Sequence, residues 1–234
     1  MAKDLFQQVG FKMKGLAILG LVLFGASAHA VIVDDFMTGS YNSGAITSGT
    51  LNAWTPAANA LGGIRFQSLT VVSNPLGGDA KCRVITSPGV LDVSTDSDVD
   101  VNYTLGYGYA SSSTTPASGP LNLNFTSNFL INLDFRTNDL AQPVTITLYT
   151  NGGANSYTRT MNISAGILSA TPLVYQFDFS TDAAALGDVD GIKIFFDPAA
   201  GGDFSLNGIQ AVPEPMSIVA ISLGALVLLR RRKK

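Results

Sequence analysis

The residue types that carry most protein chemistry are scarce in this chain. Its 234 residues include one histidine, His29, and one cysteine, Cys82. His29 belongs to an N-terminal leader described below, so the remaining chain has no histidine. It therefore cannot form a Ser-His-Asp triad, a Cys-His pair or a zinc site built from His or Cys. A disulfide within the chain is excluded as well. The groups left for chemistry are carboxylates, amides, hydroxyls and aromatic rings.

Cys82 stands between two bases, Lys81 and Arg83. Neighbouring cations would lower the pKa of the thiol if all three side chains met. On a β-strand, however, successive side chains point to opposite faces, which separates Cys82 from both bases. The sequence therefore predicts a buried, unreactive thiol.

Carboxylates cluster most densely at Asp96-Ser97-Asp98-Val99-Asp100, with Asp92 just before. Alternate carboxylates on an extended chain repel one another unless a cation lies among them, and Ca²⁺ prefers oxygen ligands. An EF-hand does not fit, because Val101 occupies the glycine position and Tyr107 the position of the terminal glutamate. A solvated acidic loop is the better interpretation. The pair in Asp188-Val189-Asp190-Gly191 is explained by a turn as well as by a metal.

Aromatic rings that lie flat on a surface can stack on the apolar faces of sugar rings, so they are the candidates for sugar contact. Trp54, the only tryptophan, lies in a stretch rich in Gly, Asn and Ala that is typical of an exposed loop. The remaining candidates are Tyr41, Tyr103, Tyr107 and Tyr109. An aromatic side chain that caps the edge of the fold explains Trp54 at least as well.

The elements that must position these side chains are β-strands. Short runs rich in Val, Ile, Thr, Phe and Tyr alternate with Gly, Asn, Ser, Asp and Pro at the spacing of all-β proteins, and no stretch carries a helical stripe of useful length. The predicted strands are residues 31–36, 63–72, 81–86, 99–105, 121–125, 129–136, 144–149, 157–163, 174–179, 192–196 and 204–209.

Alternation is clearest in residues 129–136, where Phe129, Ile131, Leu133 and Phe135 share one face. Strands of this kind have one apolar and one solvated side. Because two apolar faces must be buried against each other, the expected fold is all-β, a two-sheet antiparallel β-sandwich of jelly-roll type. A barrel is the alternative.

The first 30 residues have the layout of a secretory signal peptide. Three lysines precede an apolar run at residues 15–25, which leads to Ala28-His29-Ala30, a small-x-small cleavage site for signal peptidase. The apolar run is too short for an ordinary membrane helix. Translation can start at Met1 or at Met13, since either start leaves a basic end, an apolar centre and the cleavage site.

The last 23 residues also have three parts. Pro213-Glu214-Pro215 is followed by the uncharged residues 216–229 and then by a basic cluster. Fourteen residues reach only about 21 Å as a helix, whereas a bilayer core is about 30 Å thick. Such a helix would hold the protein at a membrane only transiently, with the basic cluster kept on the cytoplasmic side. That cluster is Arg230, Arg231, Arg232, Lys233 and Lys234.

This tail resembles the PEP-CTERM sorting signal of Gram-negative bacteria, with Pro213, Glu214 and Pro215 as the motif. The resemblance implies that a membrane protease-transpeptidase, exosortase, removes the tail and that the protein reaches the cell surface or the extracellular matrix. An ordinary C-terminal anchor is the alternative. A Gram-positive cell-wall signal has the same layout, but the chain has no LPxTG motif.

Between the two ends the chain is acidic. Of its 17 acidic residues only Asp4 and Glu214 lie outside residues 31–212, which leaves 15, all of them Asp. Of its 14 bases eight lie at the two ends, which leaves six: Arg65, Lys81, Arg83, Arg136, Arg159 and Lys193. A domain about nine charges negative does not bind nucleic acid, whose phosphates require a basic face.

The central part is similar to the jelly-roll ectodomains that accompany PEP-CTERM tails and that resemble carbohydrate-binding modules. The residues that carry this are Asp34-Asp35-Phe36, Gly62-Gly63-Ile64-Arg65 and the run from Asp203 to Ile209. The first and last strands of a jelly roll can lie side by side, which would bring Asp34 or Asp35 near Asp203. In similar sandwiches a structural calcium can bind there. No sugar ligand is carried over from the resemblance.

The sequence thus predicts a signal peptide at residues 1–30, a β-sandwich ectodomain at 31–211 and a PEP-CTERM sorting signal at 212–234. The expected function is that of an exported, exosortase-processed, non-catalytic surface or matrix protein that binds or structures exopolysaccharide. One alternative is a glycoside hydrolase with two catalytic Asp residues, which needs carboxyls roughly 5 to 10 Å apart in a cleft. The other is a purely structural adhesin without a glycan ligand.

Overall fold

A computed structural model of the protein describes residues 29–213, and the regular secondary structure of this part of the chain is almost entirely β-strand. Two short 3-10 helices, η1 (Leu61–Gly63) and η2 (Ser180–Ala185), are its only helices. Neither helix of residues 29–213 is long and apolar enough to cross a membrane. The strands are β1 (Val31–Asp34), β2 (Tyr41–Asn42), β3 (Gly49–Pro56), β4 (Ile64–Ser73), β5 (Ala80–Ile85), β6 (Val90–Thr95), β7 (Asp100–Tyr107), β8 (Leu130–Asn138), β9 (Gln142–Thr150), β10 (Asn155–Ile163), β11 (Leu173–Asp178), β12 (Val189–Phe196) and β13 (Phe204–Val212).

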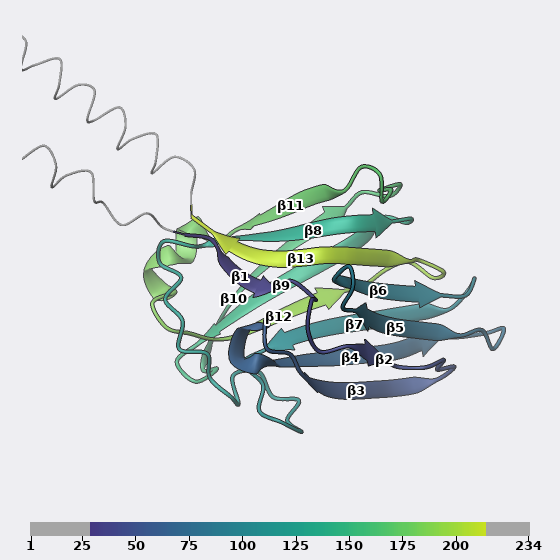
Figure 1. The fold of residues 1–234 in the computed structure, drawn as a ribbon, viewed down its shortest axis with the longest axis horizontal. Coiled ribbons are helices and arrows are strands. Elements are labelled where there is room, and N and C mark those ends of the chain that lie inside the picture. Colours follow the sequence, from purple (N-terminus) through teal and green to yellow (C-terminus); the bar gives the residue numbers. More distant parts are fainter. Residues whose placement is uncertain (1–28, 214–234) are drawn as a thin grey trace, which may run out of the picture.

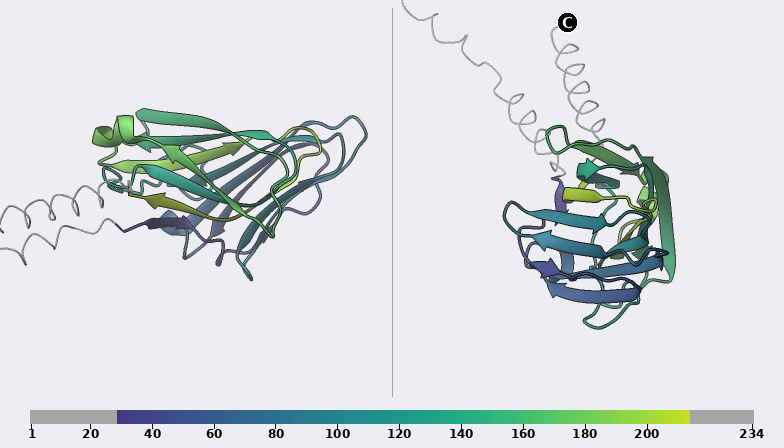
Figure 2. Two further views of the ribbon diagram at one scale, coloured as in Figure 1. Left: turned by 90° about the horizontal axis from the view of Figure 1, so that it is seen from above. Right: turned by 90° about the vertical axis from the view of Figure 1, so that its right-hand side faces the viewer.

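The strands form two antiparallel sheets packed face to face (Figure 1). Sheet A has the order β11-β8-β13-β6-β5-β2, and β1 pairs with the second half of β13. Sheet B has the order β10-β9-β12-β7-β4-β3. Two further views show strands of both sheets running along the length of the molecule (Figure 2). The prediction of a two-sheet antiparallel sandwich of jelly-roll type is confirmed, and the barrel alternative is wrong.

Alternating sequences create the two sheets. In β9, Val144, Ile146 and Leu148 are fully buried, while Thr145 and Thr147 face outward. The same period in the other strands fills the space between the sheets with Val, Leu, Ile, Phe and Tyr. Because burial of apolar surface is the main stabilising term, this shared core fixes which face of each strand turns inward.

The structure corrects the predicted strands at several points. The expected strand at residues 121–125 is absent, and only Leu123 makes an isolated bridge there, to Val189. The strands β2, β3 and β6 are absent from the predicted set, although the Val- and Leu-rich β6 has a composition typical of a strand. β3 forms because β4 pairs with it along its whole length, from Gly49↔Val71 to Pro56↔Ile64. Half of its residues, Gly49, Asn52, Ala53 and Pro56, are of types depleted in strands.

The two ends of the described chain lie side by side. Val31 in β1 is the cross-strand partner of Ala211 in β13, so both strands begin or end at the same end of the sandwich (Figure 1). Ala30 is exposed and Pro213 is half-buried. The division into leader, ectodomain and sorting signal stays a prediction, because the leader and the sorting signal lie almost wholly outside the described residues. This holds for Ala28, Glu214, Pro215 and the basic cluster Arg230, Arg231, Arg232, Lys233 and Lys234.

Candidate functional site

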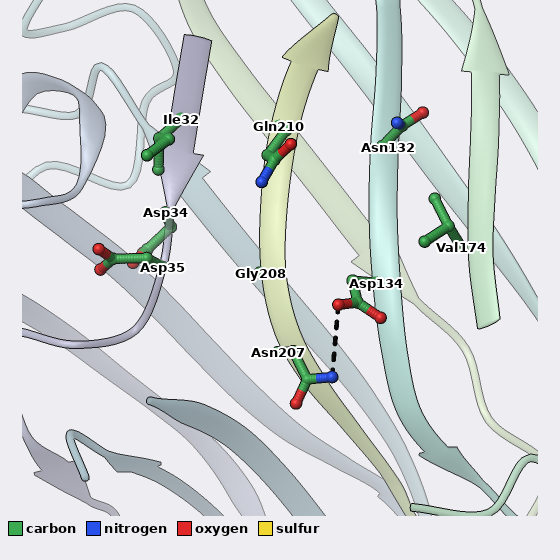
Figure 3. A pocket seen from close by; sticks show the side chains of 9 residues that line it. All are labelled: Ile32, Asp34, Asp35, Asn132, Asp134, Val174, Asn207, Gly208 and Gln210. Carbon is green, nitrogen blue, oxygen red and sulfur yellow. Dashed lines mark hydrogen bonds between the residues drawn. The ribbon is translucent and has the colours of Figure 1, made fainter. Parts of the chain in front are cut away.

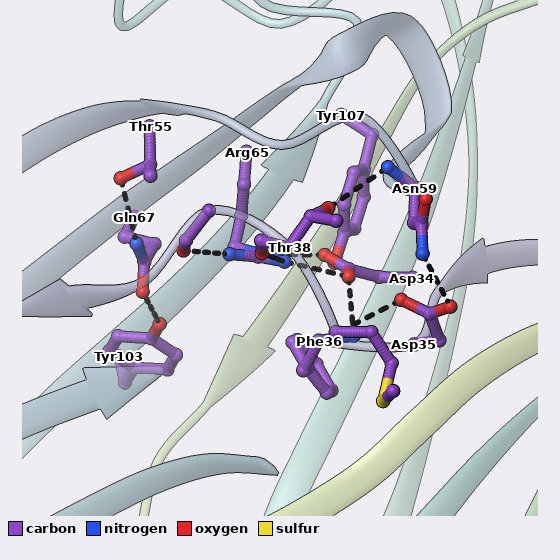
Figure 4. A network of polar contacts seen from close by, with 12 residues as sticks. Asp34, Asp35, Phe36, Thr38, Thr55, Asn59, Arg65, Gln67, Tyr103 and Tyr107 are labelled. Atoms are coloured by element: carbon purple, nitrogen blue, oxygen red, sulfur yellow. Dashed lines mark hydrogen bonds and ion pairs between the residues drawn. The ribbon is translucent and has the colours of Figure 1, made fainter. Parts of the chain in front are cut away.

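Asp34 is a structural residue at the centre of a buried polar network (Figure 4). Arg65, in β4 of sheet B, donates from Nε to Asp34 Oδ2 over 2.6 Å and from Nη2 to Asp34 Oδ1 over 2.7 Å. Both side chains have 0% exposure. The Tyr107 hydroxyl donates to Asp34 Oδ2, and the Phe36 amide donates to Oδ1. The carboxylate is therefore fully engaged, and the ion pair links the two sheets.

The rest of the Arg65 guanidinium is also satisfied. Its Nη1 and Nη2 donate to the carbonyl oxygens of Gly39 and Thr38. Burial, the largest single influence, lowers the pKa of Arg65, but the hydrogen bonds to Asp34 and the charges of Asp34, Tyr107 and Tyr103 together raise it by more, so the net shift is upward. Burial, and after it the Asp34 carboxylate, raises the pKa of Tyr107 well above its usual value.

The structure brings neither Asp34 nor its neighbour Asp35 close to Asp203, so the predicted metal pairing is wrong. β1 does lie beside β13, as expected, but Asp34 is opposite Ile209. Asp203 is six residues earlier in the chain, roughly 20 Å away along the strand at about 3.3 Å per residue. There its Oδ1 accepts from the Thr95 amide over 2.7 Å. Within residues 29–213, no group of three or more His, Cys, Asp or Glu side chains is arranged to hold a metal ion.

The other acidic residues singled out in the sequence have local partners. Asp92 lies in β6 and pairs with Arg83. Asp96 Oδ2 accepts from the Asp79 amide, and Asp98 adopts a left-handed turn conformation with φ 66°. Asp190 is buried in β12, and its Oδ2 accepts from the Gly152 amide over 2.6 Å. An ion pair, backbone hydrogen bonds and a turn therefore account for these carboxylates without a metal ion.

Cys82 is a buried free thiol, as predicted. In β5 it faces the core, while Lys81 and Arg83 face outward. Burial raises the pKa of Cys82 to about 12. The thiol is therefore protonated and unreactive at neutral pH.

The structure corrects the predicted position of Trp54 and of two tyrosines. Trp54 lies in β3 rather than in a loop, is half-buried, and donates from its indole to the Ser113 carbonyl over 2.8 Å. Tyr103 and Tyr107 are fully buried between the sheets and are excluded from sugar contact.

Trp54 belongs to an aromatic group on the outer face of sheet B. Its ring centroid is 5.5 Å from that of Phe66, and Phe66 stacks on Tyr109 at 4.6 Å. Tyr109 begins the loop that follows β7 and lies over Gly106, where a Cβ atom would come within 2.3 Å of the tyrosine ring. Gly106 therefore makes room for the stack. Tyr109 is almost fully buried, so it supports the wall of a surface hollow rather than an exposed platform.

The hollow beside this wall, the sheet B hollow, has a volume of about 220 Å³. Its lining includes Ser68, Thr104 and Lys193 of the sheet and Thr114 and Pro116 of the loop after β7. The Lys193 Nζ lies 5.8 Å from the centroid of the half-buried Phe195 ring.

The hollow continues into a strip that crosses all six strands of sheet B. Two rows of cross-strand neighbours form this outer strip: Trp54, Phe66, Gly106, Lys193, Thr147 and Thr158 in one, and Asn52, Ser68, Thr104, Phe195, Thr145 and Thr160 in the other. Threonine hydroxyls pair across β9 and β10, with Thr145 and Thr160 2.9 Å apart and Thr147 and Thr158 3.1 Å apart. The strip contains no acidic residue. Sequence reasoning missed it, although the Thr-x-Thr alternation of β9 and β10 was a usable signal.

A second hollow, of about 170 Å³, lies on the outer face of sheet A (Figure 3). We call it the sheet A hollow. Residues of four strands line it, and Gly208 of β13 forms its floor. The principal side chains around it are Ile32, Asn132, Asp134, Val174, Asn207 and Gln210. Asp35 lies at its edge and accepts from the Asn59 side chain and the Met37 amide.

Neither a protein-family model nor a curated protein sequence matches the chain. Among solved structures it is similar to a family 11 carbohydrate-binding module from Clostridium thermocellum in complex with a β-1,3-1,4-mixed-linked tetrasaccharide. That match has 13% identity, covers 80% of this chain and 98% of that one, and has a TM-score of 0.41. The family 11 module of the cellulase Lic26A-Cel5E of the same organism gives 13% identity, 81% and 97% coverage and a TM-score of 0.40.

A family 29 carbohydrate-binding module in complex with mannohexaose gives 11% identity, 79% and 91% coverage and a TM-score of 0.37. Identities and TM-scores at this level do not assign the chain to any of these families.

Proposed function

We propose that the sandwich is a non-catalytic, polysaccharide-binding domain and that it binds its glycan along the outer strip of sheet B. The observation that carries the proposal is the composition of this strip. Residues 31–212 hold 15 Asp and six bases. The strip has none of these Asp residues, and it includes Lys193, which makes no ion pair within the described residues.

The side chains of the strip match the chemistry of a neutral or weakly acidic polysaccharide. Hydroxyl and amide groups both donate and accept hydrogen bonds, as sugar hydroxyls do. The half-buried rings of Trp54 and Phe195 offer apolar surface to the C–H faces of sugar rings. At about 4.8 Å between strands, the strip spans roughly 24 Å, which is long enough for several sugar units.

A glycosidase needs two facing carboxyls beside the scissile bond. The outer strip offers none, which supports binding without cleavage. A structural adhesin would share the fold but would bind no glycan, so the two functions differ in a measurable way.

The test uses the protein as exported by the producing cells, on an array of neutral, amino and acidic oligosaccharides, followed by calorimetry on each hit. Saturable binding with no change in the oligosaccharide after long incubation is expected. Shortened products would establish the glycoside hydrolase, and no binding to any glycan would favour the structural adhesin.

We also propose that the protein is exported, released by signal peptidase after Ala30, held briefly at the inner membrane by residues 216–229, and cleaved by exosortase near Pro213-Glu214-Pro215. The order of the three C-terminal parts supports this. Val31 pairs with Ala211, so the two ends of the sandwich that adjoin the proposed leader and sorting signal lie side by side.

Sorting is tested by intact mass and C-terminal sequencing of the protein from the native surface. We expect residues 230–234 to be absent from it. The Glu214→Ala variant and deletion of residues 216–234 should both change its location on fractionation. An unchanged mass and location would reject the sorting proposal and leave the glycan proposal untouched.

A further inference from the structure

The sheet A hollow has the geometry of a site for a single sugar unit. Gly208 in β13 has no side chain, so a depression remains between β1 on one side and β8 on the other. Ile32 and Val174 lie on opposite sides of it, with Gln210 and Asn132 between them (Figure 3). Both apolar side chains are exposed, Ile32 by 51% and Val174 by 60%. They offer apolar contact to a ring placed between them.

Polar groups of the hollow come from neighbouring strands in register. Gln210 is the cross-strand partner of both Ile32 and Asn132, and Gly208 is the partner of Asp134. Asn207 Nδ2 donates to Asp134 Oδ2 over 3.3 Å. Asn132 Oδ1 accepts from Gln176 Nε2 over 3.1 Å, so the Asn132 side chain offers its Nδ2 as a donor, and the Gln210 amide can both donate and accept.

The hollow carries negative charge that no base neutralises. The ion pairs within residues 29–213 are Arg65–Asp34, Lys81–Asp79, Arg83–Asp92 and Arg159–Asp182. Asp134 and Asp35 are in none of them. Arg136, two residues beyond Asp134 on β8, forms no ion pair with it. Asp34, whose charge is balanced by Arg65, contributes no net charge.

We propose that the sheet A hollow binds an amino sugar that carries a free ammonium group, as in a de-N-acetylated hexosamine unit of a polysaccharide. The ammonium would pair with Asp134, the ring hydroxyls with Asn132 and Gln210, and the ring faces with Ile32 and Val174. A uronic acid is disfavoured by like-charge repulsion. A bare metal ion is disfavoured because the hollow is large enough for several water molecules and has apolar sides.

This site is independent of the proposed glycan strip, because the two lie on the outer faces of different sheets. Either binding proposal can therefore fail while the other holds. Variants of Asp134 should leave binding along the strip unchanged, and variants of Phe195 should leave the sheet A hollow unchanged.

The experiment is calorimetry of the exported protein at pH 6, where the amine is protonated, with glucosamine, N-acetylglucosamine and galacturonate tetramers. The glucosamine tetramer is expected to bind best. The Asp134→Asn variant, which keeps the side-chain shape, should weaken its binding roughly threefold to tenfold, in line with loss of a partly exposed charged contact. Asp188→Asn is the matched control, because Asp188 is exposed and lies in neither hollow.

Equal affinity for the three tetramers, or equal loss in the Asp134→Asn and Asp188→Asn variants, would overturn the proposal. So would the same affinity in a Gln210→Arg variant, which places a positive charge on the exposed side of the hollow. A calcium titration that displaced the glucosamine tetramer one to one would assign the hollow to a cation instead.

Discussion

Arg65 in sheet B reaches both carboxylate oxygens of Asp34 in sheet A, and neither side chain has any solvent exposure. Buried ion pairs are weak evidence for net stability, but removal of one partner leaves an uncompensated charge in the core. The pair therefore fixes the position of β1 in sheet A relative to β4 in sheet B. The packing of β1 depends on this contact with the opposite sheet.

We expect Asp34→Ala to lower the free energy of unfolding by about 3–5 kcal/mol, because the Arg65 guanidinium is left buried without its partner. Urea unfolding followed by fluorescence measures the change, and Asp188→Ala serves as an exposed control with an expected effect within about 0.5 kcal/mol. The double variant Asp34→Leu/Arg65→Met should be no less stable than Asp34→Ala. Similar midpoints for Asp34→Ala and Asp188→Ala would contradict the assignment.

Alkaline pH should destabilise the protein through Cys82. The thiol pKa rises from 9.0 to about 12 on folding, so the folded state holds this proton more tightly than the unfolded state does. The resulting stabilisation is complete below pH 9 and is lost as the pH rises toward 12. Tyr103 and Tyr107, whose pKa values are also raised by burial, act in the same direction.

Urea unfolding midpoints at pH 7, 9 and 10.5 test this loss of stability. In the Cys82→Ala variant the midpoint should fall less steeply with rising pH. A maleimide reagent at pH 7.5 should label the native protein much more slowly than the unfolded protein. Rapid labelling under native conditions would show that the thiol is accessible.

Gly106→Ala should destabilise the protein by about 1–3 kcal/mol, since the new methyl group would overlap the Tyr109 ring and force it off Phe66. Gly187→Ala is the matched control, because the nearest atom to its Cβ would be 3.9 Å away. Thermal unfolding measures the stability, and near-ultraviolet circular dichroism reports the aromatic group. An unchanged aromatic signal in Gly106→Ala would mean that the stack does not depend on this glycine.

Phe195→Ala should weaken glycan binding along the outer strip roughly tenfold, about 1.4 kcal/mol, because it removes an apolar face beside Lys193. Leu76→Ala, a comparable truncation at a residue 74% exposed in a loop, should leave affinity unchanged. Calorimetry with the best array ligand measures both. Equal affinities for the two variants would place the glycan elsewhere.

Several features of the fold follow from the sequence because they rest on local patterns. Alternation in residues such as Ile131, Leu133 and Phe135 determines which side of a strand is apolar, and strands with one apolar side need a second sheet. The same alternation placed Cys82 in the core. The charge of the domain and the three parts of the C-terminal tail are likewise properties of the sequence itself.

Which side chains meet depends on how distant strands pair and pack. β3 is a strand because β4 pairs with it, so Trp54 lies in a strand and not in the predicted loop. Asp34 was expected near Asp203, but the register of β1 on β13 placed it opposite Ile209 and against Arg65. The outer strip and the sheet A hollow each join residues from four or more strands. Register between distant strands depends on packing of the whole core, and a two-residue period in one segment carries no information about it.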